Sequence, residues 1–295
     1  MKKSIAARGL AFSALSSLLF QACESKTQPP FADTQQENSA RAPEPPPVPN
    51  PMDSPVIQKI LKRAQSRSRG PIKVVPLPYG PGASQAYTRP LGDGSGSEGW
   101  DIHHMVGPSS DYNEALLAHE LGHVILINKG FPGVMFRLKK SLDSDSDRAL
   151  YFIGKQMGPD CFPDELIDRE SVREGFKPNL LLERQMELTE QGVGQFSVGE
   201  FQDSPKLNKE FEAVKLFCLG KRVPHKTMQG FEGRVERTYG RTIMDRERKL
   251  AKEFRGQRCR IDDPTGCFKL VLKLRKAMGM EDLISFFNPK TKKWE

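Results

Sequence analysis

The sequence predicts an α+β domain, with a small N-terminal sheet, one central helix and a mainly helical C-terminal lobe. Three observations predict this fold class. Short strand-like runs alternate with Gly- and Pro-rich turns between residues 72 and 106, a long apolar helical pattern occupies residues 112–128, and helical patterns dominate the rest of the chain. The 295 residues are 37% hydrophobic, which suffices for a sizeable core and excludes a protein with many membrane spans.

Residues 1–22 have the layout of a secretory signal peptide, so we expect the mature protein to be exported. Positive charges at positions 2, 3 and 8 precede an apolar run of about a dozen residues. The run ends in Leu-Phe-Gln-Ala-Cys, which resembles a lipoprotein box and makes Cys23 the expected site of lipidation. By analogy with Gram-negative lipoproteins, Glu24 in the second position implies an outer-membrane anchor facing the periplasm. The alternative is an ordinary cleaved signal that leaves a free thiol.

Residues 23–53 comprise the lipidated cysteine and a proline-rich, polar stretch with almost nothing to bury. We interpret this segment as a disordered tether between the membrane and a folded domain at residues 54–295. The formal net charge is +8, and three of the positive charges belong to the signal. The remaining excess of positive charge is mild, and the basic residues are interspersed with acidic ones. This pattern favours a solvated surface over a nucleic-acid partner. The pattern gives no indication of the oligomeric state.

The domain begins with a helix and three strands. Ser54-Pro55 is a helix start, because proline fits the first helical position, and this helix is expected to end before Gly70. Strand-like runs follow at residues 72–77, 84–89 and 100–106. Asp111 and Glu114 have capping-box spacing and Gly130 is a typical stop, so they delimit the helix at 112–128. The N-terminal lobe is therefore expected to cover residues 54–130.

Beyond residue 130 the apolar periodicity predicts helices for a C-terminal lobe at residues 131–295. The expected helices cover residues 143–157, 163–174, 178–191, 205–219, 242–255, 264–278 and 281–287. Strands thus precede the long helix and helices follow it, which is the arrangement of a two-lobed α+β domain.

The central helix contains His119-Glu120-Leu-Gly-His123 inside an apolar run. Residues four apart lie on one face of a helix, so both histidines can direct an imidazole nitrogen at one ion. Glu120 is rotated about 100° from His119, where it can reach a water on that ion without ligating it. Buried imidazoles beside a carboxylate are costly unless a cation satisfies them, and the pattern is the zinc-peptidase signature His-Glu-x-x-His. We therefore predict Zn²⁺ as the cofactor, with satisfied core histidines as the alternative.

This motif, preceded by three strands and followed by a helical lobe, resembles the thermolysin-like (gluzincin) branch of zinc metallopeptidases, which have a zincin-like fold. The resemblance covers residues 70–175. The metzincin branch is disfavoured, because the chain continues after His123 without that branch's glycine and third histidine. In gluzincins the third zinc ligand is a glutamate on a later helix, and an aspartate follows it at the fourth position.

By this resemblance the third ligand is expected in the acidic segment at residues 160–176. Glu165, in the first turn of the helix expected there, is the assigned ligand. Asp168 is expected to hydrogen-bond a ligand histidine at its other ring nitrogen. The spacing departs from glutamate-x-x-x-aspartate, since Asp168 lies three residues beyond Glu165 and position 169 is an arginine. Asp168 and Glu170 are therefore alternative ligands, and a solvated acidic helix start is a further alternative.

The implied chemistry is peptide-bond hydrolysis by a metal-activated water, with Glu120 as general base. The developing oxyanion needs another donor, and His225, Tyr239 and Arg241 are the candidates. In related peptidases the strand before the motif helix lines the cleft and can pair with an extended substrate. The run at residues 100–106 is expected to fill that role.

The chain has five cysteines. Lipidation of Cys23 leaves Cys161, Cys218, Cys259 and Cys267, which can pair in three ways. The short spacing of the last two favours a small disulfide loop over a metal site, because no other cysteine or histidine pair stands nearby.

The predicted function is a membrane-tethered zinc metallopeptidase of the bacterial cell envelope, acting on a peptide or protein substrate. Two alternatives keep the same fold. One is a non-catalytic lipoprotein that serves as a scaffold or binding module, and the other is an amidase that cleaves peptidoglycan stem peptides with the same zinc chemistry. An intact Glu120 argues against the scaffold, since a binding module has no need of a base.

Overall fold

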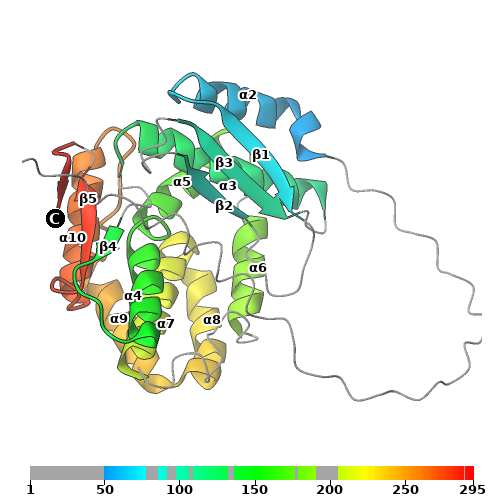
Figure 1. Cartoon of the computed structure of the whole chain (residues 1–295). Helices are drawn as coiled ribbons and strands as arrows, with labels where there is room; N and C mark the ends of the chain where they lie inside the picture. Colours follow the sequence, from blue (N-terminus) through cyan, green and yellow to red (C-terminus); the bar gives the residue numbers. More distant parts are fainter. Residues whose placement is uncertain are drawn as a thin grey trace, which may run out of the picture. The chain divides into compact units, whose positions relative to one another are not determined.

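In the computed structural model the described residues are 50–77, 86–91, 98–105, 109–131, 136–176, 179–190, 205–288 and 290–295. The chain divides into two units, Met1–Pro46 and Pro47–Glu295. The expected signal peptide, Cys23 and the tether up to residue 49 lie outside the described residues. The second unit combines small sheets with helices and is mainly helical in its C-terminal part, which confirms the predicted α+β class (Figure 1).

The N-terminal part of this unit is a three-stranded sheet packed with two helices. The elements are α2 (Pro55–Gln65), β1 (Ile72–Leu77), β2 (Ala86–Pro90), β3 (Trp100–Met105) and α3 (Ser110–Asn128). The sheet order is β1-β3-β2, with β1 parallel and β2 antiparallel to β3. Ile57 of α2, Trp100 of β3 and Leu117 of α3 belong to one buried cluster that joins the three layers. The short helix η1 (Pro51–Asp53) precedes α2, and its buried Pro51 extends the folded part into the segment assigned to the tether.

The motif helix α3 is buried along most of its length. Ser109 caps its N-terminus by accepting a hydrogen bond from the Tyr112 N–H at 3.2 Å, in place of the cap expected at Asp111. Gly130 has a φ of +84°, the left-handed conformation in which glycine ends a helix without strain. Leu121 packs in the cluster with α2 and the sheet, whereas Leu126 packs in the C-terminal core. The helix therefore lies between two cores.

The C-terminal part consists mainly of helices. They are α4 (Ser144–Met157), α5 (Phe162–Arg173), α6 (Asn179–Glu190), α7 (Pro205–Arg222), α8 (His225–Tyr239), α9 (Arg241–Glu253) and α10 (Pro264–Ala277). Figure 1 shows α4, α7, α8 and α9 grouped on the side of α5 away from the N-terminal sheet. The rings of Phe162, Phe217 and Phe254 contact one another at centroid distances of 5.6 to 6.2 Å and join α5 to α7 and to the end of α9. These contacts place α5 between the helical core and α3.

Two parts of this lobe differ from the prediction. A helix was expected at residues 281–287, but residues 284–287 belong to strand β5 (Ile284–Asn288). This strand pairs antiparallel with β4 (Phe136–Leu138) and β6 (Lys293–Trp294). The pairing buries Phe286 against the helices, and this tertiary contact outweighs the local pattern. Helix α8 is not among the predicted helices, and its Gly230 and Gly233 disfavour a helix. Its apolar face, which includes Met228 and Phe231, is buried against α6, α7 and α9 and stabilises it.

Two disulfides cross-link the C-terminal part. Cys161–Cys218 joins the start of α5 to α7, and Cys259–Cys267 closes the short loop that its spacing predicts. Within the described ranges, none of the helices combines the length and apolarity that a bilayer crossing requires.

Candidate metal centre

His119, Glu120 and His123 converge on the buried part of α3, and a ligand atom from each lies within 4.8 Å of the others. His119 and Glu120 are each only 7% exposed. The two imidazole rings meet edge to face with centroids 5.0 Å apart, as expected for side chains one helical turn apart. The motif therefore lies on a helix as predicted, and the group can hold a metal ion.

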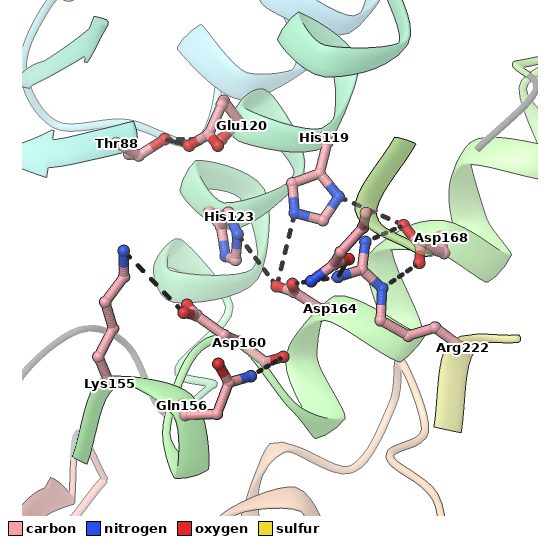
Figure 2. A network of polar contacts seen from close by, with 11 residues as sticks. Thr88, His119, Glu120, His123, Lys155, Gln156, Asp160, Asp164, Asp168 and Arg222 are labelled. Carbon is pink, nitrogen blue, oxygen red and sulfur yellow. Dashed lines mark hydrogen bonds and ion pairs between the residues drawn. The ribbon is translucent and has the colours of Figure 1, made fainter. Parts of the chain in front are cut away.

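Asp164 of α5 approaches both histidines. Its Oδ1 lies 3.2 Å from His123 Nε2 and 3.5 Å from His119 Nε2 (Figure 2). Among the described residues, no donor makes a well-aligned hydrogen bond to this buried oxygen. Two imidazole nitrogens and a carboxylate oxygen make up a donor set that zinc takes in proteins. A divalent cation fits these residues, because it would satisfy a buried oxygen that lacks a well-aligned hydrogen bond.

The charges around the site favour a cation. Burial alone would lower the pKa of His119, but Asp164 and Asp168 outweigh it and raise this pKa to about 10. Burial alone would raise the pKa of Asp164, but His119 and Arg222 outweigh it and hold this pKa well below its usual range. Asp164 is therefore ionised near neutral pH, as a metal ligand must be.

The close approach of α5 to α3 depends on Gly122. A Cβ at this position would come within 2.7 Å of Ile167 Cγ2 on α5. A side chain there would push the two helices apart, because a packed interior has no room to absorb it. Asp164 lies one turn before Ile167 and would move away from the histidines. The glycine inside the motif therefore has a packing role that brings a carboxylate to the imidazoles.

Asp168 and Arg222 hold the histidine and the carboxylate in place. Asp168 Oδ1 lies 3.3 Å from His119 Nδ1, the ring nitrogen that does not face Asp164. Arg222 of α7 donates to Asp168 Oδ2 at 2.6 Å and to Asp164 Oδ2 at 2.9 Å (Figure 2). The arginine side chain is 7% exposed, so these hydrogen bonds form in a dry environment. They occupy Oδ2 of Asp164 and leave its Oδ1 to the histidines.

Glu120 is held from the sheet. The Thr88 hydroxyl of β2 lies 2.6 Å from Glu120 Oε2 and 3.1 Å from the Glu120 backbone oxygen. Figure 2 shows this carboxylate extending toward Thr88, whereas Asp164 approaches from α5. Glu120 and Asp164 thus occupy different sides of the histidine pair.

The other acids of α5 have different neighbours. Glu165, the ligand assigned from the sequence, lies beside cations instead, with Oε2 3.6 Å from Lys221 Nζ and Oε1 3.9 Å from Arg169 Nε. Glu170 pairs with Arg173 at 2.6 Å. The sequence contained a signal for Asp164: Asp168 follows it at the fourth position, which is the ligand-x-x-x-aspartate spacing from which Glu165 departs.

The three expected transition-state donors lie on or beside α8. The Tyr239 hydroxyl accepts a hydrogen bond from Lys215 at 3.2 Å. Arg241, whose side chain is 83% exposed, lies 3.8 Å from Asp245, and His225 is exposed at the first position of α8. These contacts are made within the C-terminal helices, so the role of oxyanion donor stays a prediction for all three.

The strand expected to pair with substrate has no open edge. β3 is the central strand, with β1 on one side and β2 on the other. Within the described sheet β2 is an edge strand, and it is the strand that contacts Glu120 through Thr88.

Comparisons with known protein families, with curated proteins and with solved structures found no match for this chain. The chemistry of the site is therefore the basis for any assignment of function.

Proposed function

We propose that this protein is a zinc-dependent peptide hydrolase of the zincin type, in which His119, His123 and Asp164 bind the metal and Glu120 is the general base. The observation that carries the proposal is the convergence of Asp164 Oδ1 on the Nε2 atoms of both histidines. Three protein ligands leave a fourth position for water, which is the arrangement of catalytic rather than structural zinc sites. Asp164 takes the place that the sequence assigned to Glu165.

Bound zinc would supply Lewis acidity and a water of lowered pKa at this position. Glu120 accepts a proton from the attacking water while the Thr88 hydroxyl holds its carboxylate, and it delivers the proton to the leaving nitrogen as the peptide bond breaks. Asp168 accepts the Nδ1–H of His119, and Arg222 anchors Asp164. Both ligands are therefore preorganised, which reduces the reorganisation required during the reaction.

An extended peptide is the proposed substrate, lying along β2. The outer side of β2 offers backbone groups to a further strand within the described sheet, and Thr88 connects this strand to the base. A peptide paired with β2 would thus pass next to Glu120. The signal-like sequence at residues 1–22 and the cysteine that follows it support a location in the bacterial cell envelope, tethered to the membrane by lipid.

The test compares the wild-type protein with Glu120→Gln. The substitution keeps the shape of the side chain but removes the base, so hydrolysis of an unstructured protein such as casein should fall by about 100-fold to 10,000-fold while one zinc per chain is retained. Thr88→Val, which loosens the base without removing it, should have a smaller effect. Hydrolysis that is equal in Glu120→Gln and wild type would remove the mechanism. Zinc binding without hydrolysis of proteins or of purified sacculi would favour a scaffold, and muropeptide release alone would identify stem peptides as the substrate.

A further inference from the structure

We propose that Lys155 is a further catalytic residue, whose ammonium group binds the scissile carbonyl oxygen of the substrate as negative charge develops on it. This inference rests on the proposed zinc-peptidase function. It gives the oxyanion a donor from α4, on the opposite side of the site from β2.

The side chain of Lys155 extends toward the motif helix. The residue belongs to the last turn of α4, and it extends toward the part of α3 that carries Glu120 and His123 (Figure 2). Asp160 contributes most to raising the pKa of Lys155, and Glu120 and Asp164 contribute further. These carboxylates favour the protonated form of the lysine, because opposite charges attract. Lys155 is therefore a protonated group whose side chain extends toward α3.

The ammonium group has donors available for a substrate. The distance from Lys155 Nζ to Oδ2 of its ion-pair partner Asp160 is 4.0 Å, which is beyond hydrogen-bond distance. The Lys155 side chain is 38% exposed, so a substrate can reach it. A lysine has three N–H donors, and one partner at this distance leaves them for an incoming oxygen.

Two other cations near the metal centre are already engaged. Arg222 donates to Asp164 and Asp168 and is 7% exposed. Lys221 donates to the backbone oxygen of Gln257 and pairs with Glu165. Of these three described cations, Lys155 is the one with both exposure and free donors.

The negative charge that develops on the substrate explains why Lys155 would favour the transition state. When the water oxygen forms its bond to the carbonyl carbon, the C=O π electrons move onto the carbonyl oxygen. Lys155 donates an N–H to this oxygen and keeps its proton, and the contact weakens when the C–N bond breaks and the carbonyl re-forms. Asp160 lies 4.0 Å from Nζ, so an oxyanion that accepts a hydrogen bond at normal distance would be the stronger partner.

The test uses the whole mature protein loaded with zinc, with Lys155→Met as the variant and Lys140→Met, an exposed lysine ahead of α4, as the control. Two readouts are taken: kcat and KM for a peptide, and the Kd of a phosphinic peptide whose tetrahedral anion resembles the charged intermediate. In Lys155→Met we expect kcat and the affinity for the phosphinic peptide to fall about 100-fold, with zinc content unchanged and little change in KM. Lys140→Met should behave as wild type, and Lys155→Arg should retain more activity than Lys155→Met.

The double variant Lys155→Met/Asp160→Asn separates substrate contact from neutralisation of Asp160. If Lys155 serves only to neutralise Asp160, removing both charges restores kcat and overturns the proposal. Unchanged kcat in Lys155→Met overturns it too, as does a rise in KM confined to peptides with a free C-terminal carboxylate. In each of those outcomes an active wild type leaves the zinc-peptidase function intact. A zinc-loaded wild type that neither cleaves peptides nor binds the phosphinic peptide would overturn both proposals.

Discussion

Asp164 and Glu165 are adjacent carboxylates on α5, yet their surroundings are opposite. Asp164 faces two imidazole nitrogens and a guanidinium, and Glu165 faces Lys221 and Arg169. Successive residues of a helix are rotated by about 100°, so only one of them can point at α3. Asp168, one turn after Asp164, shares its direction and reaches the same histidine. The identity of the proposed third ligand is thus decided by helix rotation.

His119 should make the stability of the metal-free protein depend on pH. Its pKa is about 10 in the folded chain against 6.5 for a free histidine. Because the folded state binds this proton more tightly, protonated His119 stabilises the fold fully below pH 6.5. This contribution is lost as the pH rises toward 10. In EDTA we expect the urea midpoint to fall over that range, and to fall less in His119→Gln. A wild-type midpoint that rises over the range would contradict the assigned charges.

The motif was predictable from sequence because its geometry is local. Two histidines four apart on a helix share a face whatever the rest of the chain does. Arg222, Thr88 and Lys155 were not predictable, since they come from three other elements and no local pattern marks them. Their positions around α3 depend on how α7, β2 and α4 pack.

At the scale of elements, the contact between α3 and α5 builds the site, and Gly122 permits it. Gly122→Ala places a methyl within 2.7 Å of Ile167. We expect a loss of about 1 to 3 kcal/mol in the free energy of unfolding, from overpacking, together with weaker zinc binding. Chemical denaturation and competition with a chelator measure the two effects.

Gly230→Ala in α8 is the matched control for this substitution. Apart from its own helix, no described residue lies within 4 Å of the added Cβ, so the change should increase the free energy of unfolding by up to about 1 kcal/mol through helix propensity. Equal changes in the free energy of unfolding for Gly122→Ala and Gly230→Ala would contradict the packing role of Gly122 against α5.

The disulfide Cys161–Cys218 ties the start of α5 to α7, three residues before Asp164 and four before Arg222. Its sequence separation of 57 predicts that the free energy of unfolding falls by about 4 kcal/mol when both cysteines become serine. The separation of 8 in Cys259–Cys267 predicts that the same substitution there lowers the free energy of unfolding by about 2.5 kcal/mol. Only the first pair of substitutions should also weaken zinc binding. Calorimetric unfolding and zinc titration of both double variants test this, and weaker zinc binding in the second would argue against a specific link to the site.

Most elements follow from local periodicity, and the exceptions have tertiary causes. The bounds of β1 and α3 lie close to those predicted, because the strand and helix patterns there agree with the final packing. β5 and α8 were missed, since cross-strand pairing with β4 and burial against α6, α7 and α9 override the residues' own preferences.

At the scale of the whole molecule, the unit Pro47–Glu295 follows a segment whose sequence predicts export and lipidation. Cys23→Ser should move the protein from the membrane fraction to the soluble fraction and abolish lipid labelling, because one cysteine supplies the anchor. Zinc content should not change, since the site lies in the other unit. A wild-type protein that is already soluble and unlabelled would indicate an ordinary cleaved signal.

The most direct test of the metal centre is the zinc content of Asp164→Asn beside Glu165→Gln, each purified without added metal. The two substitutions remove one charge from neighbouring positions of the same helix, so they share most non-specific effects. We predict one zinc per chain in the wild type and in Glu165→Gln, and little or none in Asp164→Asn. Zinc retained in Asp164→Asn and lost in Glu165→Gln would contradict the assignment of Asp164 as the third ligand.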